Sequence, residues 1–404
     1  MAETRPAAGN ALATLLELSH YLAPHALGTT VRDVVAEAGF ANATIYVVDY
    51  EQRSMRALPP GDASLDIDST MGGRAFRHVE VVTARNEEGD LGRLWVPILD
   101  GSERMGVLSV DVEAADPQTV ADAGHIASLV GELLVSKLAY GDQLQLLKRT
   151  RPMGIPSEMR WALLPPLTFS TKQVAVSGVL EPAYDIAGDA FDYALNGDCM
   201  HLAVIDAMGH GLEASRMANL AIGTYRHARR HDYELIDMFR SMDETIASQF
   251  GPEKFVTGHL ARLDVISGVL RWANAGHPRP LLLRDASVIG ELEAETCLPI
   301  GLGDVPAEVA ETQLEPGDTV LFFTDGVVEA RSPDGELFGE WRLVDHLTRA
   351  AVSREPLPEM MRRLVHAILA HEGTELRDDA TLLAVRWMGA AGSDRPPHAS
   401  VTTS

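Results

Sequence analysis

Aspartates occur where apolar segments end at four places in this sequence. The four segments are YDIAGDAFDY (184–193), AVIDAMGHG (203–211), TVLFFTDGVVE (319–329) and RDDATLLAV (377–385). A carboxylate at the end of a buried strand loses hydration, which is unfavourable unless a positive charge meets it. Arg331 and Arg377 are the only basic residues near these aspartates in the sequence. A divalent cation is therefore the simplest partner for the carboxylates.

The residue types in these segments favour particular metals. Magnesium and manganese prefer oxygen ligands, so a set of carboxylates without histidine or cysteine suits them better than zinc. Glycines lie beside the aspartates at 188, 209, 211 and 326 and allow sharp turns and close backbone approach. A single Asp-Gly pair is most simply a turn, but four such segments in one domain favour a metal site.

Composition limits the classes of function. Lys+Arg is 34 and Asp+Glu is 58, a formal net charge of -24, which argues against nucleic acid or an anionic membrane as the main partner. The two cysteines, Cys199 and Cys297, match no CxxC pattern, so a reducing compartment fits. No signal peptide and no apolar run of transmembrane length is found, and we predict a cytoplasmic protein.

Residues 11–140 read as a small α/β domain after a disordered tail at 1–10. Helices are expected at 11–22 and 29–38, and a strand at 43–50. A hairpin is expected over 92–112, turning at Asp100-Gly101, and Pro117 opens a helix over 118–138 with one wide apolar stripe. This order resembles a GAF domain, which implies a sensor or dimerisation module. Whether it binds a ligand stays open, and the stripe could serve a homodimer or the core.

The remainder of the chain reads as a linker and a second domain. Residues 141–170 are rich in glycine and proline, with a short coupling helix expected at 157–164 and capped by Ser157. The second domain is expected over 171–388 and a disordered tail over 389–404. Its predicted strands are 174–180, 200–206, 257–264, 269–274, 280–284, 319–324 and 380–387, and its predicted helices are 213–230, 234–250, 340–352 and 357–371.

The second domain resembles the metal-dependent PPM (protein phosphatase 2C-like) family in its bacterial SpoIIE branch. The matching segments are DIAGDAFDY (185–193), VIDAMGHG (204–211), NAGHP (274–278) with Pro280, LPIGLG (298–303), PGDTVLFFTDGVVEAR (316–331), GELFG (335–339) and RDDATLL (377–383). The resemblance covers about residues 160–387. It implies an α+β chain whose C-terminal domain is an α-β-β-α sandwich of two packed sheets.

The resemblance also implies roles for individual residues. The metal ligands would be the carboxylates of Asp189, Asp206, Asp325 and Asp378 with the backbone carbonyl of Ala207, and register could exchange Asp378 for Asp379. Asp185 and Asp192 would act behind the ligands or on the substrate side. Ala187 and Ala207 replace glycines of the family pattern and would add methyl groups beside the metal loop.

The implied reaction is hydrolysis of phosphoserine or phosphothreonine on a partner protein, such as a bacterial anti-sigma-factor antagonist. Two Mn²⁺ or Mg²⁺ ions sharing a bridging water would do the chemistry. His210 and His277 could donate protons, although structural roles are favoured. His227 and His231 have helical spacing for a metal, but the surrounding arginines favour a solvated face.

Two other classes of function remain open. One is a pseudophosphatase that acts as a binding module, and the other is a metal-dependent nuclease or nucleotide phosphohydrolase. The four retained aspartates argue against the first. The second is weakened by the acidic charge and by the lack of a GxxxxGK[ST] loop.

Overall fold

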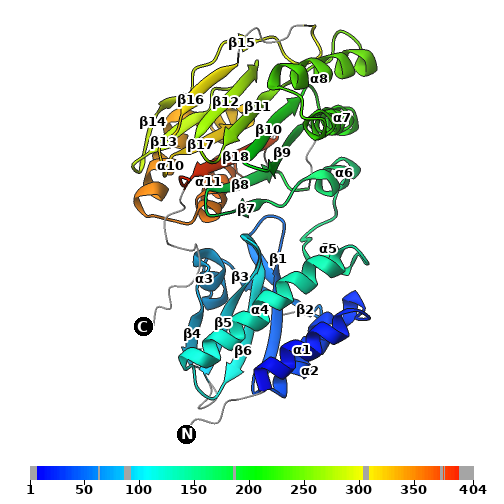
Figure 1. Ribbon diagram of the computed structural model, residues 1–404, viewed down its shortest axis with the longest axis vertical. Helices are drawn as coiled ribbons and strands as arrows, with labels where there is room; N and C mark the ends of the chain where they lie inside the picture. Colours follow the sequence, from blue (N-terminus) through cyan, green and yellow to red (C-terminus); the bar gives the residue numbers. More distant parts are fainter. Residues whose placement is uncertain are drawn as a thin grey trace. The chain divides into compact units, whose positions relative to one another are not determined.

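The computed structural model describes residues 7–61, 64–85, 92–184, 188–303, 309–373, 376 and 378–390. The chain divides into two compact units, the first reaching Arg151 and the second beginning at Pro152. Each unit has its own hydrophobic clusters. Figure 1 shows the helices and strands of both units.

The first unit is built on one antiparallel sheet in the order β3-β2-β1-β6-β5-β4. Its strands are β1 (Ala41–Val48), β2 (Ser54–Leu58), β3 (Ser64–Asp66), β4 (Val82–Arg85), β5 (Gly92–Asp100) and β6 (Glu103–Val112). Its α-helices are α1 (Ala7–Ser19), α2 (Leu27–Ala36), α3 (Met71–His78), α4 (Pro117–Leu138) and α5 (Gln143–Leu147). Helices α1, α2 and α4 pack on one face of the sheet, and α3 packs on the other.

Local sequence signals explain most of this unit. The hairpin predicted over 92–112 is confirmed as β5 and β6, and the predicted long helix is confirmed as α4. Asp116 caps α4, because its side chain accepts hydrogen bonds from the backbone N–H groups of Gln118 and Thr119. The expected tail at 1–10 is wrong over its last residues, since α1 begins at Ala7.

The second unit contains two six-stranded sheets. One has the order β15-β12-β11-β10-β9, with β16 pairing to β12, and the other has the order β14-β13-β17-β18-β8-β7. Its strands are β7 (Thr168–Ser170), β8 (Val174–Glu181), β9 (Asp189–Asn196), β10 (Cys199–Ala207), β11 (Val256–Asp264), β12 (Val269–Ala275), β13 (Leu281–Arg284), β14 (Ser287–Glu291), β15 (Thr296–Cys297), β16 (Ala310–Gln313), β17 (Thr319–Phe323) and β18 (Ala380–Trp387). Its helices are α6 (Ile155–Leu163), α7 (Gly211–Arg230), α8 (Leu235–Phe250), α9 (Asp325–Glu329), α10 (Gly339–Val352) and α11 (Leu357–Glu372).

The two sheets pack face to face between layers of helices. Helices α7 and α8 cover the β9–β12 sheet, whereas α10 and α11 cover the β8–β18 sheet (Figure 1). Side chains alternate along each strand. On β10, Leu202 and Val204 point between the sheets, while Ala203 and Ile205 pack under α7 and α8. This α-β-β-α sandwich is the fold that the resemblance to the PPM family implies.

Strands β2–β4, β7, β9 and β14–β16 and helices α3, α5 and α9 are not among the predicted elements. Two differences bear on the site. Strand β9 is not among the predicted strands, because the aspartates in DAFDYALN obscure its alternating pattern. The short helix predicted at 157–164 is present as α6, but it begins at Ile155 after Gly154, and Ser157 lies buried inside it rather than capping it.

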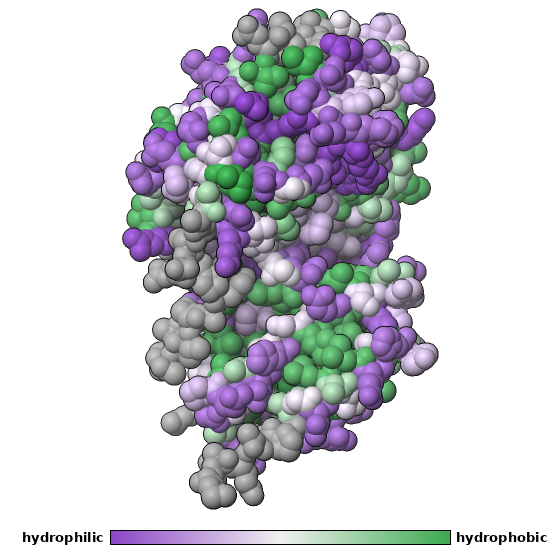
Figure 2. Space-filling view, viewed as in Figure 1, coloured by the Kyte–Doolittle hydropathy of each residue, from purple (hydrophilic) through white to green (hydrophobic). Residues whose placement is uncertain are grey.

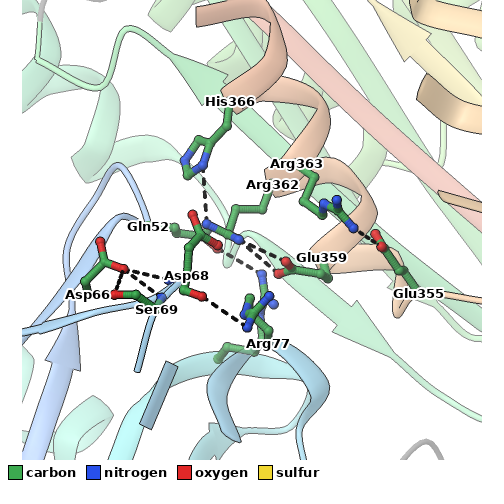
Figure 3. Close-up of polar contacts among 11 residues, drawn as sticks. Gln52, Asp66, Asp68, Ser69, Arg77, Glu355, Glu359, Arg362, Arg363 and His366 are labelled. Carbon is green, nitrogen blue, oxygen red and sulfur yellow. Dashed lines mark hydrogen bonds and ion pairs between the residues drawn. The ribbon is translucent and has the colours of Figure 1, made fainter. Parts of the chain in front are cut away.

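The surface of the second unit is rich in charged side chains. Hydrophilic residues gather over α7 and α8 in Figure 2. Some charged side chains are buried instead: on α11, Arg362 donates to both carboxylate oxygens of Glu359, whereas Arg363, which is exposed, pairs with Glu355 (Figure 3). None of the helices in the described ranges is long and apolar enough to span a bilayer.

Buried His259 makes the second unit sensitive to acid. Its Nε2 lies 2.7 Å from the carbonyl of Pro278, and burial lowers its pKa to about 4. Below about pH 6.5 the unfolded chain takes up a proton that the folded chain excludes, so the free energy of unfolding falls as pH falls towards 4. Between pH 7 and 4.5 the wild type should lose about 2–3 kcal/mol more than His259→Gln. Urea unfolding at each pH measures this, and a constant difference would contradict it.

Candidate metal centre

Asp189 and Asp206 face each other on neighbouring strands. Asp189 begins β9 and Asp206 lies opposite it in the antiparallel register with β10. Both residues have the strand parity of the side chains that point between the sheets, such as Phe191 and Val204. Asp189 is 1% exposed. The end of this β-ladder therefore brings two carboxylates together at the edge of the inter-sheet core.

The opposite sheet supplies two further aspartates. Asp325 begins α9 directly after β17, and Asp378 lies two residues before β18. Both are exposed, and β17 and β18 are hydrogen-bonded neighbours. The structure thus brings segments from four parts of the sequence to one end of the sandwich, with Asp189 buried and Asp325 and Asp378 at the surface.

The side chain of Asp379 binds backbone N–H groups at the start of β9. Its Oδ2 accepts hydrogen bonds from the N–H groups of Gly188 and Asp189, at 2.8 and 3.1 Å. Its own N–H donates to Oδ1 of Asp378 at 2.9 Å. The carboxylate of Asp379 therefore fixes the start of β9, while that of Asp378 reaches solvent. This difference favours Asp378 over Asp379 as the ligand.

Two glycines permit these close approaches. A Cβ on Gly188 would lie 2.5 Å from the carbonyl oxygen of Ala207, and one on Gly326 would lie 2.0 Å from that of Asp379. Both distances are shorter than van der Waals contact allows. Any side chain at either position would push the metal-loop segments apart.

Electrostatics couple the carboxylates. Burial and the neighbouring charges of Asp206 and Asp379 raise the pKa of Asp189 well above its ordinary value. Burial, then Asp325 and Asp378, raise the pKa of Asp206, and burial with Asp378 raises that of Asp325. In the described part of the chain, no salt bridge neutralises Asp189, Asp206 or Asp325. A bound cation would therefore stabilise the charged carboxylates of this cluster.

The candidate ligands are not preassembled around a common point. Across the described residues, no three or more His, Cys, Asp or Glu side chains are gathered tightly enough to hold an ion. Asp185, Ala187 and Arg377 lie outside the described residues.

Asp192 lies on the other face of β9. It is 1% exposed, and its two oxygens pair with Arg226 at 2.6 Å and Arg229 at 2.8 Å, both from α7. Strand alternation explains this, because positions 189 and 192 point to opposite faces. Asp192 thus joins β9 to α7.

Helix α6 and the residue before it contact the chain before Asp189, and α6 also accepts a hydrogen bond from α7. The N–H of Gly154 and the indole N–H of Trp161 donate to the carbonyls of Tyr184 and Ala183, at 3.3 and 2.8 Å. The carbonyl of Leu163 accepts from Arg226 at 2.6 Å.

Arg160 of α6 lies close to the carboxylates. It is 1% exposed and donates to Oδ1 of Asn219 at 2.9 Å. Burial lowers its pKa to about 10, and the charges of Asp189 and Asp379 oppose that shift. Sequence reasoning missed Arg160, although a lone arginine in a short coupling helix was the available signal.

The remaining candidates are distributed as follows. His277 is buried, with its Nδ1 3.0 Å from Oγ1 of Thr257, and burial holds its pKa well below the usual range. His210 is exposed before α7. Nδ1 of His231 lies 2.9 Å from the carbonyl of His227, so one of its nitrogens is engaged with backbone. The methyl group of Ala207 packs in the core under α7 and α8, which corrects the expectation that it crowds the metal loop.

Comparisons with known proteins agree with this arrangement. Residues 196–388 match the family model described as Stage II sporulation protein E (SpoIIE). Protein IcfG of Synechocystis sp. is 20% identical over 85% of this chain and 51% of its own length. Phosphoserine phosphatase RsbU of Bacillus subtilis is 22% identical over 52% of this chain and 62% of its own. The chain thus spans about half to three fifths of these relatives.

A solved structure is also similar. The RsbU and RsbW domains of Rv1364c from Mycobacterium tuberculosis superpose with a TM-score of 0.49 and 27% identity, covering 54% of this chain and 62% of that one.

The sandwich of two sheets, with aspartates gathered at one end, is the arrangement that the resemblance to PPM phosphatase domains implies. Residues 196–388 are similar to the SpoIIE family model over that whole range. The matched region contains Asp206, Asp325 and Asp378, whereas Asp189 lies just before it.

The buried position of Asp192 predicts a structural role. Asp192→Asn should lower the free energy of unfolding by about 3–5 kcal/mol, because two arginines would lose their buried partner. Asp237→Asn, in an exposed pair with Arg240, should cost less than about 1 kcal/mol. Urea unfolding measures both. A stable Asp192→Asn protein that had lost only phosphatase turnover would instead indicate a substrate-side role.

Proposed function

We propose that the second unit hydrolyses phosphoserine or phosphothreonine on a partner protein, using Mn²⁺ or Mg²⁺. The observation that carries the proposal is the register of Asp189 against Asp206 at the inter-sheet edge, with Asp325 and Asp378 coupled to them by charge. The name of the Bacillus subtilis relative, a phosphoserine phosphatase, supports the substrate class.

The donor set fits hard cations. Every candidate side-chain ligand is a carboxylate, and the raised pKa values of Asp189, Asp206 and Asp325 arise from burial and mutual repulsion that bound cations would relieve. Asp189, Asp206, Asp325 and Asp378, with the carbonyl of Ala207, would hold two ions. Because the side chains are not preassembled, ion binding would draw the exposed pair inward.

Each part of the chain would have a defined task. Bound ions would supply an activated water and neutralise charge on the phosphoryl group. Asp379 holds the start of β9 through two backbone N–H groups, so the carboxylate of Asp189 keeps its place. Buried His277 is held among Asn274 and Thr257, which favours a structural role over proton transfer.

The partner would be a phosphoprotein regulator, such as a bacterial anti-sigma-factor antagonist. The SpoIIE-family match supports this class of partner. The first unit would act as a GAF-like sensor and homodimer module. Helix α6 would transmit its state, because α6 is hydrogen-bonded to the segment before Asp189 and, through Arg226, to Asp192.

Turnover tests the proposed activity. The wild type should hydrolyse p-nitrophenyl phosphate and a phosphoserine peptide with added manganese but not with chelator. Asp206→Asn should reduce turnover by more than about 100-fold. Loss of a residue that only orients a metal ligand costs up to about 100-fold, and loss of the ligand itself should cost more. Asp237→Asn serves as the surface control.

The alternative is a pseudophosphatase that binds without turnover. Ala187 and Ala207, which replace glycines of the family pattern, would support it if their methyl groups weakened metal binding, but the Ala207 methyl group is buried in the helix-covered core. Manganese binding without hydrolysis of either substrate, in the full chain and in residues 151–404, would favour this alternative and overturn the proposed activity.

Removal of residues 1–150 tests the proposed regulation. Because the first unit would dimerise and set the position of α6, its removal should convert a dimer to a monomer. It should also shift the manganese concentration needed for half-maximal turnover. Light scattering and turnover across a manganese titration measure these effects, and no change in either would contradict the regulatory role.

A further inference from the structure

At the end of the inter-sheet core that carries the carboxylates, polar side chains replace apolar ones. Along β17 and β18 the side chains pointing between the sheets are Val320, Phe322, Val385 and Leu383. The next positions with the same parity are Thr324 and Thr381, and both are 0% exposed. Two hydroxyl groups thus replace apolar side chains in the last layer, opposite Asp189 of the other sheet.

The hydroxyl of Thr324 is directed at Asp189. Thr324 Oγ1 lies 2.7 Å from Oδ2 of Asp189, and the backbone N–H of Thr381 donates to the same Oγ1 at 2.9 Å. An amide can only donate, so it occupies a lone pair of the hydroxyl and leaves the hydroxyl proton for the carboxylate. The direction of both hydrogen bonds is therefore fixed by chemistry.

The side chain of Thr324 does not cap the helix that follows it. Thr324 is the N-cap residue of α9, a position where threonine commonly accepts a hydrogen bond from the second or third helical N–H. Its side chain makes no such bond. Its backbone N–H donates instead to the carbonyl of Thr381 at 3.0 Å, which fixes the residue against β18. The cap is replaced by a contact with Asp189.

We propose that Thr324 is a positioning residue for the metal centre: its hydroxyl, oriented by the N–H of Thr381, holds one oxygen of Asp189 and aims the other at the cation. The inference rests on the proposed metal site and adds a residue to it. A hydrogen bond from Thr324 also favours the charged carboxylate against the repulsion of its neighbours. The contact ties the metal-bearing end of β9 to the opposite sheet.

Three variants separate the hydroxyl from the bulk of the side chain. Thr324→Val keeps the shape and removes the hydroxyl. Thr324→Ala and Thr324→Ser both lack the γ-methyl group and differ from each other by one oxygen atom. Thr319→Val is the matched control, because Thr319 is a buried threonine at the other end of β17 whose hydroxyl accepts from Arg386 at 2.8 Å.

The measurement is manganese affinity of the full chain, from calorimetry and from the spin-resonance signal of free Mn²⁺. Thr324→Val and Thr324→Ala should bind manganese about 10–100-fold more weakly than the wild type, the usual effect of removing a group that orients a metal ligand. Thr324→Ser and Thr319→Val should bind close to wild type. Unfolding without metal shows whether each variant is folded, and if Thr324→Val is not, the Ala and Ser pair decides.

The outcomes distinguish this inference from the proposed function. Equal affinities for Thr324→Ala, Thr324→Ser and the wild type would overturn the role of the hydroxyl and leave the metal site intact. Equal weakening in Thr324→Ala and Thr324→Ser would assign the effect to packing of the methyl group, which also overturns it. A wild type that binds no manganese would overturn the metal site itself, and this inference with it.

Discussion

Repulsion among carboxylates gathered at one edge of the inter-sheet core is the constraint on which the second unit is built. Asp189 and Asp206 are opposite each other in a continuous ladder, so neither can move away without breaking β9 from β10. Asp325 and Asp378 add charge from the other sheet. Burial makes each of these charges more costly than it would be in water. The arrangement is therefore one that the fold imposes and that a cation would relieve.

Neutral hydrogen-bond donors contact two carboxylates of this cluster, and the buried guanidinium of Arg160 lies near the same two side chains. Asp379 accepts from two backbone N–H groups, and Asp189 accepts from the hydroxyl of Thr324. Such hydrogen bonds stabilise a carboxylate without filling the space that a metal ion needs, whereas a salt bridge would compete for the same oxygens. Arginines of α7 are instead paired with Asp192 on the far face of β9. The separation of the two faces of β9 keeps the Asp192 ion pairs apart from the carboxylate cluster.

Much of this organisation could be predicted from the sequence, because the apolar strands and the glycines beside the aspartates are local signals. The hairpin at 92–112, α4 and most strands of the second unit follow from such patterns. Strand β9 could not be found this way, since the aspartates that give it chemical interest interrupt its apolar alternation. The role of Asp192 depended on that missing strand, and the roles of Asp379 and Thr324 depend on contacts between residues more than 130 positions apart.

Helix α6 has a position in this scheme that its sequence does not reveal. It is hydrogen-bonded to Ala183 and Tyr184 before the metal loop, and through Arg226 to Asp192 after it. A rigid displacement of α6 would therefore act on both ends of the segment that carries Asp189. A shift from one favoured arrangement to the other requires only about 5.5 kcal/mol of differential interaction. Breaking one buried ion pair costs about 3–5 kcal/mol, which approaches that amount.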